Sequence, residues 1–525
     1  MKTYILYIGL LLSGYLLQAQ QVCNIIPMPV SYKQGQGTFT LNQYTVISAS
    51  SPALKEVAFY LQQELFKSKS LAVSLKPANK ISSIVLSLDP AKTVSPESYN
   101  LVVTSSVVQI TAREPVGIFY GIYSLLQLIE AGSNATFSIP VCEIHDAPRY
   151  QWRGFMLDES RHFFGKEKVK SILDWMAFYK LNRFHWHLTD EPGWRIEIKQ
   201  YPLLTLVGGI GEFKNPLVPA QYYTQEEIKE IVSYAQERFI TVIPEIDMPG
   251  HAAAANRAYH QFSGGGTLPT YPDFTFNPGN EKAYEFLTNI LREVDALFPS
   301  QMIHLGGDEV QYGNSAWETD EDVKKLRSQK NLKDLKAVEY YFIQRMADSI
   351  STLGNRVLAW DEIIDAPLPS AQPIIFWWRQ DKPIQLQKAM DKGYETVLCP
   401  RLPLYFDFVQ DSTHRIGRRW KGAYNSLSKL YSFSHEQFPE IGTRSNQILG
   451  IQANLWTETV DSPQRLDYLM FPRIAALAEA AWTASKQKDY SNFELRLKPH
   501  LKRYKELGIY YYNPFDPLEN PEAVK

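Results

Sequence analysis

The sequence is poor in cysteine and almost balanced in charge. Its 525 residues include three cysteines, Cys23, Cys142 and Cys399, which are too few for a disulfide framework. One pair could form after export, but the spacing does not say which. The 54 Lys and Arg residues face 56 Asp and Glu residues, for a formal net charge of −2. This balance gives no indication of nucleic acid as a partner.

Long apolar runs are missing after the first twenty residues. Residues 1–20 carry Lys2, then an apolar run, then small or polar residues, which predicts a secretory signal peptide cleaved near Gln20. A retained membrane anchor is the alternative, although the run is short for a spanning helix. We therefore expect an exported protein, periplasmic or extracellular, without stable membrane insertion after cleavage.

Aromatic residues, in contrast, are abundant. They make up 13% of the chain, with 11 Trp and 31 Tyr. Their flat apolar faces and polar edges suit sugar rings, although most such residues belong to protein cores.

Residues 21–148 are expected to form a small α+β domain. The runs SSIVLSLD and YNLVVTSSVVQITAR are rich in Val, Ile and Thr and predict strands. ALKEVAFYLQQELFK and PVGIFYGIYSLLQLIEA predict helices. The segment IHDAPRY at 144–150 marks a boundary, because Asp146 and Pro148 interrupt regular structure.

Residues 149–485 show a regular alternation that predicts a (β/α)8 barrel. Eight strand-like runs, beginning at 153, 182, 240, 302, 356, 373, 394 and 448, are mostly separated by amphipathic helical stretches. An open doubly wound sheet is the alternative. Residues 486–525 are expected to form a helical extension.

Polar and aromatic side chains gather at the ends of these runs. Examples are Asp158, Asp190, Glu245, Asp308 with Glu309, Trp360, Trp378, Trp456 and Glu458. In a barrel of this kind, the carboxyl ends of the strands form the mouth of the active site.

Histidines at two strand ends raise the possibility of a metal. His185 and His187 are separated by one residue, which is a known ligand spacing. However, the residue between them is Trp, and the sequence contains no His-Glu-x-x-His. We interpret His185 and His304 as packed, hydrogen-bonded histidines and predict no metal.

Several ordered motifs then point to one family. RGFMLDESRHF at 153–163, HWHLTDEPGWRIEI at 185–198, EIDMPGHA at 245–252, HLGGDEV at 304–310 and LWTET at 455–459 resemble segments of the family 20 glycoside hydrolases, in the family's order. The region before them resembles the family's noncatalytic α+β domain. The resemblance covers about residues 22–485 and implies a β-N-acetylhexosaminidase.

The resemblance also implies a substrate-assisted mechanism, an exception among glycosidases. Glu309 would be the general acid and base. The nucleophile would be the carbonyl oxygen of the substrate's own 2-acetamido group, which closes an oxazolinium ring. Asp308 would orient that group and stabilise its positive charge. No cofactor is needed, and the anomeric configuration is retained.

Further site residues are implied by the same resemblance. Arg153 is similar to an arginine that binds sugar hydroxyls, and Asp190 and His251 to an acid–histidine pair that supports the general acid. The sugar-enclosing aromatics would be Trp360, Trp378 and Trp456, with Tyr405 on the acetamido carbonyl and Asp407 and Glu458 on the sugar.

Some alternatives remain at this stage. The chain could release disaccharides, as a lacto-N-biosidase does, or be an inactive glycan-binding protein. The basic segment with Arg415, Arg418, Arg419 and Lys421 could indicate an acidic glycan, but a solvated loop is the favoured interpretation. Linkage preference and oligomeric state are not evident.

The two adjacent acids of HLGGDEV pose a geometric question, because neighbouring residues on a strand face opposite sides. We predict that Gly306 and Gly307 let the strand end leave a regular pleat, so that Asp308 and Glu309 both reach the mouth.

Overall fold

The computed structural model describes residues 23–76, 83–93, 95–131, 136–267, 269–368 and 373–523. The predicted signal peptide, residues 1–20, lies outside these ranges. Within them, no helix has the length and apolar character needed to cross a membrane. The three cysteines are all free.

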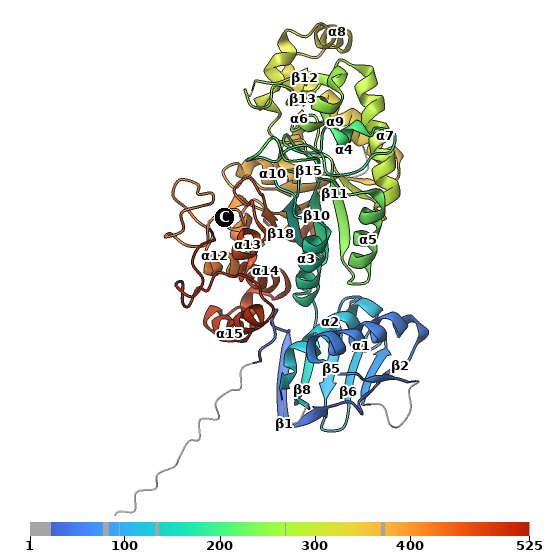
Figure 1. Ribbon diagram of the computed structural model, residues 1–525, viewed down its shortest axis with the longest axis vertical. Helices are drawn as coiled ribbons and strands as arrows, with labels where there is room; N and C mark the ends of the chain where they lie inside the picture. The colour runs from blue at the N-terminus through green and yellow to red at the C-terminus, as the bar shows by residue number, and fades with distance from the viewer. Residues whose placement is uncertain are drawn as a thin grey trace, which may run out of the picture.

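The N-terminal domain is a sheet of eight strands covered by two helices (Figure 1). The strand order is β1-β8-β5-β6-β4-β2-β3, with β7 paired to β8. Helix α2 contacts the barrel unit, where the Gln127 side chain donates a 3.1 Å hydrogen bond to the carbonyl of Phe178. The elements are β1 Ser31–Leu41, β2 Val46–Ala49, α1 Lys55–Lys69, β3 Ser74–Leu75, β4 Ile84–Leu88, β5 Tyr99–Val103, β6 Val108–Ala112, α2 Pro115–Leu128, β7 Glu130–Ala131 and β8 Phe137–Asp146.

The second unit is a closed barrel of eight parallel strands, which confirms the predicted (β/α)8 architecture and excludes the open sheet. The strands pair in the order β10-β11-β14-β15-β16-β17-β18-β9, and β18 closes the barrel against β9. Their bounds are β9 Trp152–Asp158, β10 Arg183–His187, β11 Thr241–Glu245, β14 Met302–His304, β15 Arg356–Trp360, β16 Ile374–Trp377, β17 Glu395–Leu398 and β18 Ile448–Leu455.

Helices surround this barrel, and their ends are set by the local sequence. In α5, for example, the Thr224 side chain and Glu227 form a reciprocal capping box. The helices are α3 Lys166–Phe178, α4 Leu203–Leu206, α5 Gln225–Gln236, α6 Ala253–Ala258, α7 Glu281–Leu297, α8 Glu321–Lys330, α9 Leu335–Thr352, α10 Pro383–Asp391, α11 Arg401–Leu404, α12 Leu427–Tyr431, α13 Pro463–Met470, α14 Arg473–Trp482 and α15 Tyr490–Glu506; a hairpin of β12 Ser263–Gly265 and β13 Thr275–Phe276 lies after α6.

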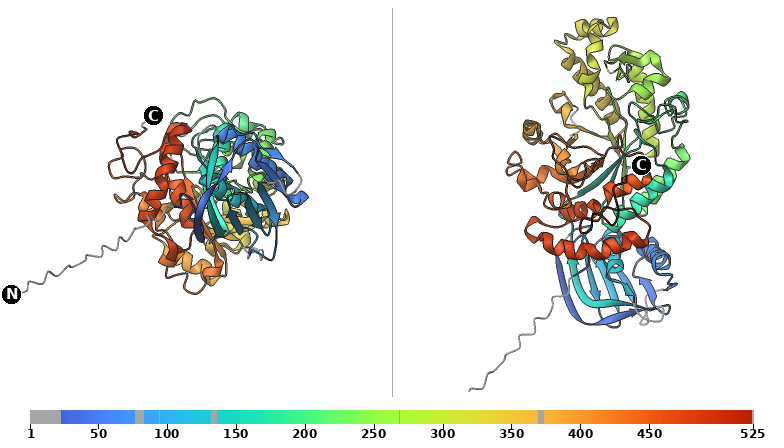
Figure 2. Two further views of the ribbon diagram at one scale, coloured as in Figure 1. Left: turned by 90° about the horizontal axis from the view of Figure 1, so that it is seen from below. Right: turned by 60° about the vertical axis from the view of Figure 1, so that its left-hand side comes forward.

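Helix α15 lies beside the N-terminal domain, as both views in Figure 2 show. Its Arg496 donates a 2.9 Å hydrogen bond to the Ile25 carbonyl and pairs with Glu479 of α14. The N-terminal domain itself meets the barrel where the strands begin, because Arg153 near the start of β9 contacts Glu97. The strand ends that carry the predicted site therefore lie away from that domain.

Candidate active site

A cavity of about 490 Å³ opens where the barrel strands end. It brings together side chains from six strand ends and from the loop after β17. The lining side chains are Arg161, His251, Asp308, Glu309, Trp360, Trp378, Arg401, Tyr405, Phe408, Arg418, Arg419, Trp420, Lys421, Trp456 and Glu458.

The chain leaves the regular pleat directly after β14, as predicted. Gly306 and Gly307 have φ values of 71° and 89°, and Glu309 has a φ of 50°. A Cβ on Gly306 would lie 1.8 Å from Asp247 Oδ1, and one on Gly307 would lie 2.5 Å from Ile363 Cγ2. Both glycines are therefore required by space and by backbone conformation. The resulting bend brings both acids to one cavity, which answers the geometric question.

Asp308 is the more enclosed of the two acids. Its side chain is 11% exposed, against 34% for Glu309. Burial, with Glu362 and Glu309 nearby, raises the pKa of Asp308 to about 8, although His251 acts in the opposite direction. His251 Nε2 lies 3.6 Å from Asp308 Oδ2 and 3.8 Å from Glu309 Oε2, so one imidazole faces both acids.

Asp190 holds this imidazole from behind. The Nδ1 of His251 lies 3.0 Å from Asp190 Oδ1, and Arg161 Nη1 lies 2.6 Å from Asp190 Oδ2. Burial would raise the pKa of Asp190, but Arg161 and His251 bring it well below its usual range. The ionised carboxylate fixes the Nδ1 proton of His251 and leaves Nε2 facing the acids. Asp190 thus has the supporting position predicted for it, and it does not line the cavity.

The prediction that Arg153 binds the sugar is wrong. Arg153 is fully buried near the start of β9, and its five N–H donors are all used. They bond to Glu97 twice, at 2.7 and 3.1 Å, and to the Lys180 carbonyl, the Tyr150 carbonyl and the Tyr120 hydroxyl. No donor is left for a ligand.

Arg161 is the arginine that lines the cavity, and the sequence reasoning missed it. It belongs to the same RGFMLDESRHF motif, but it follows the carboxyl end of β9 at Asp158. Its guanidinium lies 5.1 Å from the Trp456 ring and 3.3 Å from Glu191. The rule that barrel sites use strand ends would have favoured Arg161 over Arg153.

Four aromatic side chains form a box beside Asp308. The rings of Trp360 and Trp456 are 5.9 Å apart, and Trp378 and Tyr405 are stacked at 6.2 Å. The indole N–H of Trp360 donates to Glu245 at 2.8 Å, and that of Trp378 donates to Glu362 at 3.0 Å. These bonds turn the polar indole edges away and leave apolar faces toward the cavity.

Arg418 pairs with the two remaining acids of the predicted site, Asp407 and Glu458. It lies 3.3 Å from Asp407 Oδ2 and forms an ion pair with Glu458 Oε1. Glu458 lines the cavity, whereas Asp407 is buried and does not. Burial raises the pKa of Asp407 to about 7, although Arg418 acts against this shift. A contact between Asp407 and a sugar stays a prediction.

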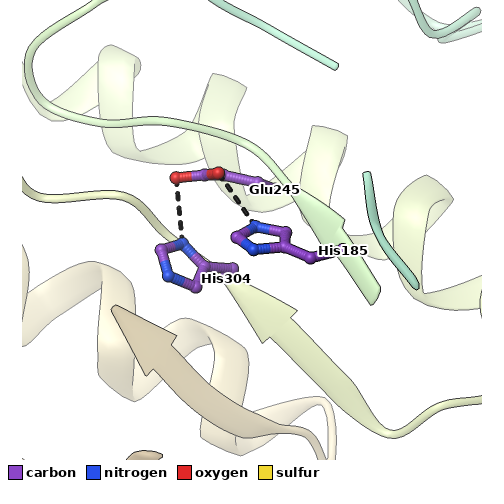
Figure 3. Close-up of side chains that lie close together, drawn as sticks. All are labelled: His185, Glu245 and His304. Atoms are coloured by element: carbon purple, nitrogen blue, oxygen red, sulfur yellow. Dashed lines mark ion pairs between the residues drawn. The ribbon is translucent and has the colours of Figure 1, made fainter. Parts of the chain in front are cut away.

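His185, Glu245 and His304 form a buried triad (Figure 3). Trp360 packs against both histidines and donates its indole N–H to Glu245. Glu245 lies 2.9 Å from His185 Nε2 and 3.0 Å from His304 Nδ1. The amide nitrogen of Gln452 donates to His185 Nδ1, because the amide oxygen accepts from the Trp152 indole. This pattern gives His185 Nε2 the ring proton and directs it toward Glu245. This geometry agrees with packed, hydrogen-bonded histidines that anchor Trp360 through Glu245.

Comparisons with known proteins give one family for both units of the chain. Residues 150–485 match the pattern described as glycosyl hydrolase family 20, catalytic domain, and residues 22–147 match glycosyl hydrolase family 20, domain 2. A beta-hexosaminidase of Porphyromonas gingivalis is 34% identical over 94% of this chain, which spans 64% of that relative's length. A beta-hexosaminidase of Vibrio furnissii is 34% identical over 87% of this chain and 76% of its own.

Solved structures give the same result. The exo β-N-acetylglucosaminidase of Vibrio harveyi, in complex with N-acetylglucosamine, matches with a TM-score of 0.87 at 31% identity, over 94% of this chain and 79% of its own. The β-N-acetylhexosaminidase of Bacteroides fragilis matches with a TM-score of 0.81 at 30% identity, over 96% and 100% of the two chains. The ordered motifs, the barrel and both family patterns agree, and the chain belongs to glycosyl hydrolase family 20.

Proposed function

We propose that this protein is an exo-acting, retaining β-N-acetylhexosaminidase that removes terminal β-linked GlcNAc or GalNAc from glycans. The observation that carries the proposal is the pair Asp308 and Glu309, which a glycine-dependent bend directs into one aromatic-lined cavity. The relatives named as beta-hexosaminidases support this activity.

The two acids have environments that suit different tasks. Glu309 is the more exposed and faces the opening, where it can protonate the leaving oxygen and later activate water. Asp308 is enclosed beside the aromatic box, where an acetamido methyl group would be surrounded by Trp360, Trp378 and Trp456. Its Oδ1 is buried without a hydrogen-bond partner in the described protein, and it is the natural acceptor for the acetamido N–H.

The reaction then needs no protein nucleophile. The acetamido carbonyl oxygen attacks the anomeric carbon while the glycosidic bond breaks, and Glu309 gives its proton to the leaving oxygen. Holding this internal nucleophile in line gives it a high effective molarity. The Asp308 carboxylate stabilises the positive charge that develops on the acetamido nitrogen. Water, activated by Glu309, then opens the oxazolinium ring and restores the original configuration.

The test is hydrolysis of aryl β-GlcNAc substrates by wild type and by Glu309→Gln. We expect kcat/KM to fall by about 10²–10⁴-fold for a poor leaving group. The loss should be much smaller for a dinitrophenyl leaving group, because it needs little protonation. Glu318→Gln, which removes an exposed carboxylate, is the control. Equal losses for both leaving groups would contradict the general-acid role of Glu309. An aryl β-glucoside lacks the 2-acetamido group, so a rate comparable to that on aryl β-GlcNAc would contradict substrate assistance.

We also propose that the protein is exported to the periplasm or outside the cell. The support is the charge and apolar pattern of residues 1–20. Cell fractionation of the full chain and of a chain without residues 2–20 tests this proposal. Retention of both forms in the cytoplasm would contradict it.

A further inference from the structure

Three basic side chains at the cavity opening are not used by the mechanism above. Arg401, Arg419 and Lys421 all line the cavity together with Trp420. We refer to these three cations as the basic rim. Arg419 and Lys421 are exposed, so they lie at the outer part of a cavity whose inner part holds the buried Asp308.

Two of the three rim cations, Arg419 and Lys421, carry positive charge that nearby acids do not neutralise. Among the described residues, Arg419 and Lys421 have no carboxylate within ion-pair distance. The Arg419 guanidinium is instead held by two backbone carbonyls, those of Ser412 and His414. Carbonyl oxygens orient the guanidinium but leave its full charge available.

Arg401 is fixed in place by aromatic rings. Its guanidinium lies 3.4 Å from the centre of the Trp420 ring and 4.6 Å from that of Trp378, and it pairs with Asp381 at 2.6 Å. Such stacking restricts the side chain before any ligand binds. The neighbouring Arg418 differs from Arg419 and Lys421, because Asp407 and Glu458 both pair with it.

The position of the rim determines which part of a substrate it meets. An exo-acting enzyme holds the terminal sugar in the inner cavity, beside Asp308 and the aromatic box. The rest of the glycan must leave through the opening, past Glu309, which protonates the bond between the two parts. A charged group that reaches Arg419 or Lys421 therefore belongs to the leaving-group side of the scissile bond.

We propose that the basic rim is an acceptor-side subsite for glycans with an anionic group, a sulfate ester or a carboxylate, on the sugar that follows the terminal residue. This inference rests on the proposed function and specifies its substrate class. The shared chemistry is a negatively charged oxygen group that meets Arg419 and Lys421.

Matched disaccharides test the proposal. The probes are GlcNAc β-linked to galactose, the same disaccharide with a sulfate on the galactose, and GlcNAc β-linked to glucuronate. For wild type we expect kcat/KM to be at least about threefold higher for an anionic probe than for the neutral one at low salt, as for an exposed charge pair. The ratio should approach one at high salt, because exposed charges are screened. The two anionic probes separate sulfate from carboxylate recognition.

Variants assign the effect to the rim. Arg419→Gln/Lys421→Gln should lower the anionic-to-neutral ratio to about one. Arg415→Gln removes an exposed cation from the same loop that does not line the cavity, and the ratio should stay at the wild-type value. The inference would be overturned if the anionic-to-neutral ratio of kcat/KM is one or less for wild type, or if the double variant leaves this ratio unchanged. In either case, hydrolysis of the neutral probe would still uphold the proposed function. A chain that cleaves neither aryl β-GlcNAc nor any disaccharide would contradict both.

Discussion

Two clusters of buried charge lie at opposite ends of the same barrel, and they differ in how completely they are paired. At the end where the strands begin, Lys180 donates to Asp146, Tyr99 and Ser124 at 2.8–3.1 Å. Arg153 uses all its donors, two of them on Glu97. Each charge has a counter-charge, and the contacts join the barrel to the N-terminal domain.

At the mouth the charges are incompletely satisfied. Asp308 Oδ1, His251 Nε2 and Glu458 Oε2 are buried without a hydrogen-bond partner in the described parts of the chain. Burial raises the pKa of both Asp247 and Asp308, and the charge of Asp308 adds to the shift of Asp247. Buried polar atoms are normally bonded, so a concentration of exceptions marks a place where a ligand supplies the partners. Complete pairing indicates a structural cluster, and incomplete pairing indicates the functional one.

Among changes that compare the two ends of the barrel, the largest effect should come from replacing the arginine at the mouth. Arg161→Met removes the cation that lines the cavity and holds Asp190. We expect kcat/KM on aryl β-GlcNAc to fall by about 10²–10³-fold, as when a donor at a reacting site is removed. Circular dichroism would show a folded protein. If activity stays within about twofold of wild type, Arg161 has no functional role.

Arg153→Met should affect stability much more than activity. The change leaves Glu97 without its bidentate partner, and breaking a buried ion pair typically costs about 3–5 kcal/mol. We expect a lower melting temperature and an earlier urea midpoint, with the activity per folded molecule close to that of wild type. A large loss of kcat/KM at unchanged stability would restore Arg153 as a sugar ligand.

The fold could be predicted because its signals are local. Each of the eight barrel strands is a short apolar run between amphipathic helices, and all eight lie where the sequence placed them. In the N-terminal domain, β4, β5, β6, α1 and α2 were also evident. β1 and β8 were not predicted, since β1 is largely exposed and β8 contains Pro140. Their pairing depends on contacts about 100 residues apart in the chain, such as Ser31 with His145.

The site could be predicted best where a motif and a strand end coincide. Asp308, Glu309, His251 and Trp456 are such cases, and the structure brings them together. Arg153 was chosen because it resembles a sugar-binding arginine of the family, although it lies near the start of β9 and not at its carboxyl end. Arg401, Arg419 and Lys421 line the cavity only because the loop after β17 folds back over it. For Arg419 and Lys421, the sequence alone favoured a solvated loop. The role of each of these cations depends on its partners in the folded structure, which the sequence alone does not give.

The smallest predicted effect concerns stability and its dependence on pH. Burial raises the pKa of Asp308 to about 8, with Glu362 and Glu309 adding to the shift and His251 opposing it. In an unfolded chain, an aspartate side chain has a pKa of about 4. For an acid with a raised pKa, the favourable contribution to folding is present at low pH and is lost as pH rises toward 8. Ionisation of Asp308 thus destabilises the free protein, although the proposed mechanism uses the carboxylate.

Asp308→Asn should remove this dependence. The variant and wild type should melt at similar temperatures near pH 4, and the variant should melt about 2 °C or more higher at pH 8, while its kcat/KM is much reduced. Asp348→Asn, which removes an exposed carboxylate, is the control. Differential scanning calorimetry across this pH range is the measurement. A difference that is independent of pH would mean that the neutral and charged forms of Asp308 are equally compatible with the folded mouth. The charged groups at the mouth would then lower the free energy of unfolding no more than the fully paired groups at the other end of the barrel. In that case, incomplete pairing of buried charges would not identify a functional cluster.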